Sequence, residues 1–442
     1  MKCFLVSLGC PKNLVDSEIM LALLVKEGYN LTYSEEEAEI IIVNTCGFIE
    51  SAKAESIETI LEMAMLKKTG SCRALVVTGC LSQRYSKDLK AEIPEVDAFI
   101  GTGEFHRITE VLEKLKKKKK IELVSDPEYI WIPDIPRLIT TPFFYAYLKI
   151  AEGCSHKCSF CIIPELRGKY RSRPMEDIIK EAQMLAEQGV KEIIIIAQDP
   201  TIYGRDLPTK SRLINLLKKI EKIEGIKWIR LLYLYPDSIS NDLLTFIKES
   251  DKICNYIDLP LQHCESIILK AMGRQGNKDS FLRLIENIRN KVPHVTLRTS
   301  LIIGFPGETE EEFVSLLDFI EKVRFDRLGA FEYSKEEGTK AATLKEQIKK
   351  KTKKERLHRL MTLQQKISLE KNKSLIGTVQ EVIVEKIITK GTYKTIGRTK
   401  RDAPDIDGSI YLQASEVLPG DIVKAKITKA KEYDLIGEIV SK

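Results

Sequence analysis

Three closely spaced cysteines, Cys154, Cys158 and Cys161, are the residues of this sequence whose type and spacing best suit redox chemistry. They follow the apolar run 144–150, which predicts a strand, and Ala-Glu-Gly at 151–153 ends that strand. These thiols, the loop triad, therefore lie in a loop at the carboxyl end of a strand. A four-iron cluster held by three cysteines keeps one iron without a protein ligand, and such an iron can bind and reduce a substrate.

A structural zinc ion is the alternative interpretation of the same loop. It would need a fourth protein ligand. His156 lies too close to its neighbouring cysteines in the sequence to reach the same metal ion. We therefore expect an iron–sulfur cluster in preference to zinc.

Three further cysteines, Cys10, Cys46 and Cys80, each follow a short apolar run that predicts a strand. Because the carboxyl ends of parallel strands meet at one edge of a sheet, these thiols, the sheet triad, could converge on a second cluster. Glycines beside them permit tight turns close to a ligand. Buried structural cysteines are the alternative. We expect that structural role for the other four cysteines: Cys3, Cys72, Cys254 and Cys264.

The elements that must position the sheet triad alternate between strand and helix over residues 1–115, which predicts an N-terminal α/β domain with a doubly wound parallel sheet. The expected strands are 2–8, 39–44, 74–78 and 98–100, and the expected helices are 17–26, 51–67 and 82–92. Residues 116–141 are rich first in lysine and then in proline, which predicts an extended linker.

Residues 142 to about 335 repeat the alternation with a longer period. The expected strands are 144–150, 192–197, 228–234, 255–259, 295–303 and 326–333, and the expected helices are 175–188, 210–222, 238–249, 278–291 and 309–323. Six such strands make a partial (βα)6 barrel, whose chemistry lies at the carboxyl ends of its strands. Gln198, Gly304 and Gly307 lie at such ends and are candidate ligand contacts, whereas His263 is expected to be a hydrogen-bonded loop histidine.

The last hundred residues change character twice. Residues 340–373 hold twelve Lys and Arg against three Asp and Glu, and they predict one or two basic helices that extend the barrel domain to 142–373. Residues 375–442 contain β-branched runs at 378–384, 393–398, 409–412, 422–427 and 435–440. Such runs, separated by glycines, predict a small all-β barrel of a kind that docks nucleic acid or protein.

Composition limits the class of protein. A chain of 442 residues, 43% hydrophobic and 30% charged, suits two to four globular domains. No apolar stretch is long enough to span a membrane and the N-terminus does not resemble a signal peptide, so we expect a cytoplasmic protein without a membrane partner. Ten cysteines in such a chain favour metal binding over disulfides. The net charge of +6 gathers in 340–373 and the lysine run 114–120, which argues against a uniformly basic nucleic-acid surface.

The loop triad resembles the signature of the radical S-adenosylmethionine (SAM) superfamily. Within that superfamily, Leu-Gly-Cys-Pro-Lys-Asn at 8–13, together with the rest of the sheet triad, resembles the N-terminal domain of methylthiotransferases. The final β domain resembles their TRAM module. The resemblance covers nearly the whole chain, and Cys264 replaces a small residue without touching an expected ligand. Further matching stretches lie at 161–164, 167–168, 172–174, 272–274 and 300–308.

The resemblance implies two [4Fe-4S] clusters with different tasks. The cluster on the loop triad would bind SAM at its open iron and, when reduced by an electron donor, would cleave it to a radical that abstracts hydrogen from carbon. The cluster on the sheet triad would carry the sulfur that is methylated and transferred, and a sulfur source is required. We expect Gln198, Gly304 and Gly307 to help to seat SAM.

The substrate can also be predicted. Gly-Cys-Pro-Lys-Asn at 9–13 resembles the family branch that modifies the β-carbon of an aspartate in the small-subunit ribosomal protein twelve, whereas tRNA-modifying relatives typically carry Gly-Cys-Gln-Met-Asn. The final β domain has eleven Lys and Arg against ten Asp and Glu, and so lacks the broad basic surface that tight tRNA binding needs. We predict the protein substrate. A tRNA adenosine is the alternative, because 340–373 could follow a phosphate backbone, and an electron carrier with two clusters is a different class of alternative.

Overall fold

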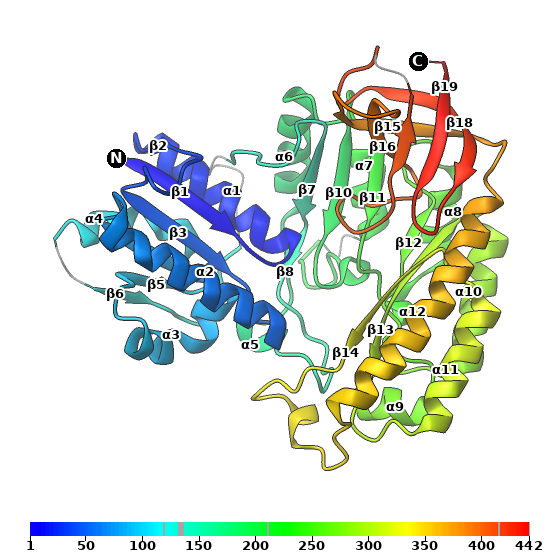
Figure 1. Ribbon diagram of the computed structural model, residues 1–442, viewed down its shortest axis with the longest axis horizontal. Coiled ribbons are helices and arrows are strands. Elements are labelled where there is room, and N and C mark those ends of the chain that lie inside the picture. Colours follow the sequence, from blue (N-terminus) through cyan, green and yellow to red (C-terminus); the bar gives the residue numbers. More distant parts are fainter. Residues whose placement is uncertain (118–119, 131–136, 210–211, 414–415, 442) are drawn as a thin grey trace.

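The computed structural model describes residues 1–117, 120–130, 137–209, 212–413 and 416–441. Its N-terminal region, blue to cyan in Figure 1, is a six-stranded sheet of order β2-β1-β3-β4-β5-β6 with every neighbouring pair parallel. The strands are β1 (Lys2–Ser7), β2 (Asn30–Leu31), β3 (Ile40–Thr45), β4 (Ala74–Gly79), β5 (Ala98–Ile100) and β6 (Ile121–Leu123).

Helices cover both faces of this sheet because buried apolar residues point to alternate sides of its strands. Ile42 of β3 packs in one cluster with α1 (Pro11–Lys26) and α4 (Ile108–Leu115), and the 3₁₀ turn η1 (Phe105–Arg107) precedes α4. The next residue, Val43, packs with α2 (Glu50–Thr69) and α3 (Cys80–Glu92) on the other face. The predicted doubly wound α/β fold is confirmed.

The two largest differences from the expected boundaries in this region are at α1 and in the linker. Helix α1 begins at Pro11 and not at residue 17, because proline suits the first helical position and the polar residues of the first turns, such as Asn13 and Asp16, are buried by tertiary contacts. Residues 121–123 of the expected linker form β6, a parallel edge strand of the sheet. The linker residues 131–136 and the expected helix start at 210–211 lie outside the described residues.

The central region has six strands in two parallel sheets, β11-β10-β7 and β12-β13-β14, joined by a β-bridge between Ile229 and Ile253. They curve into a partial barrel with helices outside (Figure 1). The strands are β7 (Tyr145–Lys149), β10 (Glu192–Ile196), β11 (Trp228–Leu231), β12 (Tyr256–Asp258), β13 (Thr296–Ile303) and β14 (Arg327–Glu332). The main helices are α6 (Met175–Glu187), α7 (Leu213–Ile220), α8 (Asn241–Glu249), α10 (Lys278–Lys291) and α11 (Glu310–Val323).

Side chains along the barrel strands point alternately towards the outer helices and towards the inside of the barrel, and the inner ones pack against the N-terminal region. Ile193 and Ile195 of β10 pack against the outer helices, whereas Ile194 and Ile196 belong to the cluster that includes α1. The inner face of the barrel is therefore covered by the α1 side of the N-terminal sheet. Strand β11 ends three residues before the expected boundary, and Tyr233 beyond it has a left-handed backbone with φ of 65°.

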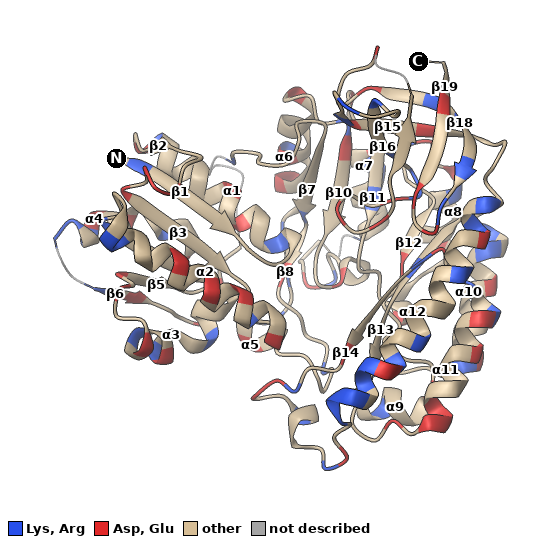
Figure 2. Ribbon diagram, in the orientation of Figure 1, with Lys and Arg blue, Asp and Glu red and all other residues tan. Residues whose placement is uncertain are grey.

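Short elements at the carboxyl ends of the barrel strands hold the cysteine loop. They are the antiparallel pair β8 (Ala151–Glu152) and β9 (Arg171–Ser172), the helices α5 (Ile163–Arg167) and α9 (Ser266–Ala271), and the 3₁₀ turns η2 (Pro200–Ile202), η3 (Pro236–Ser238) and η4 (Lys340–Thr343). The basic segment then forms one helix, α12 (Lys350–Lys373), which starts ten residues after the expected beginning. Figure 2 shows Lys and Arg gathered at its amino end.

The C-terminal region is a closed five-stranded barrel of order β15-β16-β17-β19-β18, as predicted. It packs against the amino ends of the central strands. Arg398 pairs with Glu192, the first residue of β10, and Asp402 pairs with Arg327, the first residue of β14. This barrel therefore lies at the end opposite to the cysteine loop. Its strands are β15 (Val379–Ile387), β16 (Thr395–Thr399), β17 (Ile410–Leu412), β18 (Ile422–Ala430) and β19 (Leu435–Ser441).

Candidate active site

The loop that carries Cys154, Cys158 and Cys161 is fixed by close backbone packing. The amide of Cys154 donates to the carbonyl of Gly168 at 3.0 Å, and a Cβ on Gly153 would lie 2.2 Å from the carbonyl oxygen of Lys169. On the other side, a Cβ on Gly273 would lie 2.5 Å from the carbonyl oxygen of Lys157. Only glycine permits both approaches, so the loop is clamped between the segment after α5 and the turn after α9.

The loop thiols are half-buried, and the loss of contact with water disfavours their charged form. It raises the pKa of Cys154 to about 11 and that of Cys161 to about 12, with neighbouring thiols contributing in the same direction. One cation opposes this effect. Nη1 of Arg274 lies 3.9 Å from Sγ of Cys158, while Nη2 donates to the carbonyl of Pro260 at 2.8 Å. Thiols in such a place bind as thiolates when a metal centre supplies the compensating charge.

The sheet triad lies at three neighbouring strand ends. Cys10 precedes the first residue of α1, Cys46 follows β3, and Cys80 is the first residue of α3. A Cβ on Gly9, whose φ is +88°, would lie 2.8 Å from Cβ of Cys46. A Cβ on Gly47 would lie 2.9 Å from the backbone of Leu81, next to Cys80. The three turns therefore pack directly on one another.

The electrostatics of the sheet triad also show that its thiols are neighbours. Burial raises the pKa of Cys46 to about 12, and the charges of Cys80 and Cys10 add to the rise. Burial raises the pKa of Cys80 too, while a hydrogen bond and the positive charge of Arg167 oppose the rise. Arg167 belongs to α5, which follows the loop triad in the sequence.

Helix α5 brings the two triads to either side of one short segment. It starts two residues after Cys161, and Ile162 and Leu166 form one apolar cluster with Cys80 and the ring of Phe48. In the part of the chain that the structure describes, no group of three His, Cys, Asp or Glu side chains converges on a single metal ion. Each triad offers thiols alone, and an all-thiol donor set fits an iron–sulfur cluster.

A buried network of charges joins the same two regions. Nη1 of Arg167 lies 3.0 Å from Oδ2 of Asp16 and 3.1 Å from Oε2 of Glu152, and Nη2 donates to Oδ1 of Asn13 at 2.7 Å. Lys149 pairs with Asp16 and, at 2.7 Å, with Glu152. Burial alone would raise the pKa of Glu152, but Arg167 and Lys149 hold it well below its ordinary value. Two cations and two carboxylates therefore neutralise one another between the N-terminal sheet and the barrel.

Sequence reasoning did not identify Asp16, Lys149 or Arg167 as members of a site. Lys149 lies in an apolar run that predicts a strand, and Asp16 is distant in the sequence from both Lys149 and Arg167. The one available signal was the presence of charged residues at positions that the helical and strand patterns expect to be buried.

Gln198 lies beside this network. Its Nε2 donates to Oε1 of Glu152 at 3.1 Å, whereas its Oε1 is buried without a hydrogen-bond partner among the described residues. A buried carbonyl oxygen without a donor suits a ligand that brings an N–H or O–H group. His156 of the cysteine loop contacts Asp199 at 2.7 Å and stacks on Tyr235 with ring centroids 4.0 Å apart.

Gly304 and Gly307 lie in the turn between β13 and α11, where both have positive φ. A Cβ on Gly304 would lie 2.4 Å from Cγ of Lys353, so this turn packs under the start of α12. His263 is fully buried, and its Nδ1 accepts from the amide of Glu265 at 3.0 Å, as expected for a hydrogen-bonded loop histidine.

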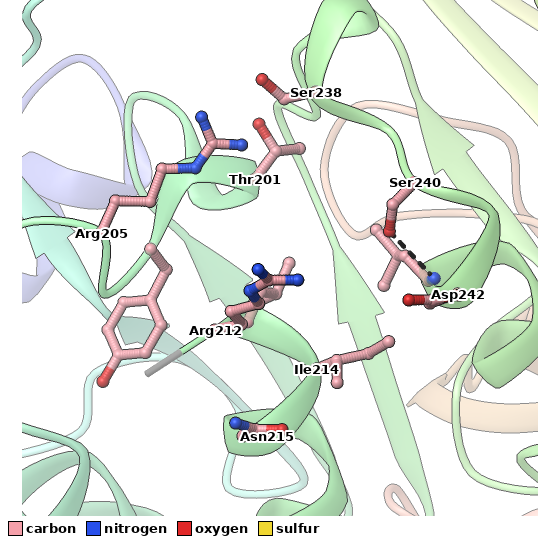
Figure 3. A pocket seen from close by; sticks show the side chains of 11 residues that line it. Thr201, Arg205, Arg212, Ile214, Asn215, Ser238, Ser240 and Asp242 are labelled. Carbon is pink, nitrogen blue, oxygen red and sulfur yellow. Dashed lines mark hydrogen bonds between the residues drawn. The ribbon is translucent and has the colours of Figure 1, made fainter. Parts of the chain in front are cut away.

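A pocket of about 570 Å³ lies between the loops after β10 and β11 (Figure 3). Arg205, Arg212 and Ser240 are among its lining residues. Thr201 connects it to the cysteine loop, because its amide donates to Asp199, the partner of His156, at 2.9 Å. None of its described lining residues is a cysteine, so this pocket adjoins the loop triad without containing it.

Three family models match this chain. The Uncharacterized protein family UPF0004 matches residues 2–101, the Radical SAM superfamily matches 148–320 and the TRAM domain matches 376–440. Among solved structures, the radical SAM methyltransferase TsrM from Kitasatospora setae has a TM-score of 0.54 at 14% identity, covering 74% of this chain and 72% of that chain. The cobalamin-dependent radical enzyme OxsB has a TM-score of 0.51 at 14% identity, covering 83% and 56%. These two likenesses show the fold.

The fold and the cysteine loop thus define a radical SAM enzyme, a class that uses SAM and an iron–sulfur cluster. Curated relatives specify the family. The "Ribosomal protein uS12 methylthiotransferase RimO" of Clostridioides difficile is 52% identical over 441 residues, covering 100% of this chain and 99% of that protein. The protein of the same name from Pelobacter propionicus is 51% identical over 439 residues, covering 99% and 98%. The chain belongs to this RimO family of methylthiotransferases, as the sequence predicted.

Proposed function

We propose that this enzyme transfers a methylthio group to the β-carbon of an aspartate in ribosomal protein uS12, using two [4Fe-4S] clusters and SAM. The full-length similarity to RimO proteins supports the substrate. One structural observation carries the proposal. Helix α5 follows Cys161 and packs on Cys80, so a single segment joins the two thiol triads.

In this proposal the loop triad (Cys154, Cys158 and Cys161) holds the cluster that binds SAM. That cluster and SAM, when bound, supply one-electron cleavage of the sulfonium bond and hydrogen abstraction from carbon. Arg274 places a positive charge beside Cys158, which favours the thiolate that a cluster requires.

The sheet triad (Cys10, Cys46 and Cys80) holds the second cluster, at which the methylated sulfur is carried. Cys80 is buried, and the hydrogen bond and positive charge of Arg167 oppose the rise in its pKa that burial causes. Because Arg167 is also held by Asp16 and Glu152, the same side chain keeps the N-terminal sheet docked on the mouth of the barrel.

Gln198, Gly304 and Gly307 are proposed to help to seat SAM. Gln198 supports this role best, because its Oε1 is a buried acceptor without a donor among the described residues. The glycines contribute backbone that can approach a ligand in a turn with positive φ. Residues 1–115, 142–373 and 375–442 are proposed as the functional domains of the chain, and 116–141 as the segment that joins the first two and adds β6 to the N-terminal sheet.

The proposed reaction also needs an electron donor and a sulfur source, and it takes place in the cytoplasm with the ribosomal protein. None of the helices in the described residues combines the length and the apolar composition of a membrane span.

Competition between substrates tests this proposal. Reconstituted enzyme is given SAM, a reductant and sulfide under anaerobic conditions, together with uS12 and tRNA in equal amounts. Mass spectrometry of both substrates should find methylthio-aspartate in uS12 and unmodified adenosines. Methylthio-adenosine with unmodified uS12 would overturn the proposed substrate.

A further inference from the structure

Lys12 is a buried lysine without a carboxylate partner among the described residues. It is 8% exposed, and it is the second residue of α1, two positions after Cys10. Within residues 1–117, 120–130, 137–209, 212–413 and 416–441, no ion pair and no hydrogen bond of its ammonium group is found. Nζ of Lys12 lies over the ring of Tyr233, 3.6 Å from its centroid. The thiol of Cys10 is an acidic neighbour of this lysine, but no carboxylate pairs with it, so the ammonium on the aromatic face can still accept an anion from a ligand.

The carboxylates around Lys12 are already engaged by other cations. Asp16 and Glu152 belong to the network of Lys149 and Arg167. Asp258, beneath Tyr233, accepts from Arg298 at 2.8 Å.

Asp258 also accepts from the amide of Tyr233 at 2.9 Å. That hydrogen bond fixes Tyr233 in its left-handed conformation, with φ of 65°, where a non-glycine residue is strained. The strained backbone of Tyr233 therefore holds its aromatic ring under the ammonium group of Lys12. No carboxylate of the described residues pairs with this ammonium group.

The position of Lys12 suits a ligand at the reacting centre. It lies between the sheet triad, through Cys10, and the carboxyl end of β11, through Tyr233. The first turn of α1 adds the free amides and the positive end of the helix dipole. Lysine and helix terminus together would attract an anion at the junction of the N-terminal sheet and the barrel mouth.

We propose that Lys12 and Tyr233 form the subsite that binds the side-chain carboxylate of the substrate aspartate. This inference rests on the proposed function, in which the β-carbon next to that carboxylate receives the methylthio group. A carboxylate held at Lys12 keeps the adjacent carbon beside the sheet triad. An amide in the same place forms no ion pair, so the subsite distinguishes Asp from Asn.

A binding cycle tests the subsite. The full-length enzyme, reconstituted with its iron, is titrated with uS12 and with uS12 whose modified aspartate is changed to Asn. The wild-type enzyme should bind the Asp form about 30-fold or more tightly than the Asn form, because a desolvated ion pair is lost with the change. Lys12→Met should bind both forms equally. Lys26→Met, an exposed lysine on the same helix, should keep the wild-type preference.

The stability of the substrate-free enzyme provides a second readout that a purely structural lysine would not give. Measured on the metal-free protein, in which Cys10 is a thiol, Lys12→Met removes a buried charge that has no carboxylate partner and keeps an unbranched side chain, so it should raise the unfolding temperature. A structural lysine would lower it.

Retention of the Asp preference in Lys12→Met, or a wild-type enzyme that binds both forms equally, would overturn the subsite. A wild-type enzyme that leaves uS12 unmodified would instead overturn the proposed function. The two failures are therefore separate.

Discussion

Arg167→Met should loosen the docking of the N-terminal sheet on the barrel. In the wild-type protein, Arg167 and Lys149 balance the buried carboxylates Asp16 and Glu152. The substitution leaves one excess buried negative charge, and removal of one partner from a buried ion pair costs about 3–5 kcal/mol. This loss corresponds to local opening that is about 10²-fold to 5 × 10³-fold more frequent. Hydrogen exchange of the amides in α1 and α5, measured on the metal-free protein, should accelerate by that factor.

A second substitution separates charge balance from lost packing. Arg167→Met combined with Asp16→Asn leaves the neutral pair of Lys149 and Glu152, so the double variant should recover about 2 kcal/mol of the loss. As a matched control, Arg359→Met on α12 removes an exposed ion pair with Glu310 of α11 and should change stability by less than about 0.5 kcal/mol. Equal exchange rates in the single and double variants would refute the charge argument.

Three further predictions follow from single side chains. Gln198→Ala should weaken SAM binding about tenfold in an equilibrium titration, since a buried hydrogen-bond partner is lost; unchanged affinity would remove Gln198 from the site. Gly9→Ala should abolish iron binding by the sheet triad alone, because its Cβ would lie 2.8 Å from that of Cys46, and iron analysis showing both clusters would contradict this packing. Burial and the charge of Arg356 lower the pKa of His263 to about 3. The unfolded chain therefore binds a proton below about pH 6.5 that the folded chain does not, and stability is lost as pH falls through that range. His263→Gln should remove about 2 kcal/mol of this loss at pH 5, measured by chemical unfolding at pH 5 and 7, and an identical pH dependence in both proteins would contradict it.

The fold was predictable because its signals are local. Short apolar runs alternate with amphipathic helices over the first two regions, and glycine-separated β-branched runs mark the last one. The helix 278–291 was predicted with its observed bounds, since Asn277 caps it and its apolar residues follow a helical period. The predicted ends of helices and strands differ from the observed ones where tertiary contacts override the local sequence pattern. Asn44 donates to the carbonyl of Asn13 at 2.8 Å, and such buried polar contacts let α1 start six residues early.

Of the residues in the candidate site, the cysteines were the ones that could be predicted from the sequence. Thiols at matching strand ends carry a spacing signal, whereas Lys149 and Arg167 show their shared role only through Asp16, which is far away in the sequence. Lys12 is a similar case, because its burial against Tyr233 depends on the docking of two regions that no local pattern reveals.

The division of labour between the two triads is the central claim, and one comparison tests it most directly. Two variants, with either the loop triad or the sheet triad changed to alanine, are reconstituted anaerobically and assayed for iron, 5′-deoxyadenosine release and methylthio product. The sheet-triad variant should keep about half of the wild-type iron, continue to cleave SAM and form no methylthio-aspartate. The loop-triad variant should lose both reactions. Loss of SAM cleavage in a sheet-triad variant whose remaining cluster is spectroscopically intact would contradict the account.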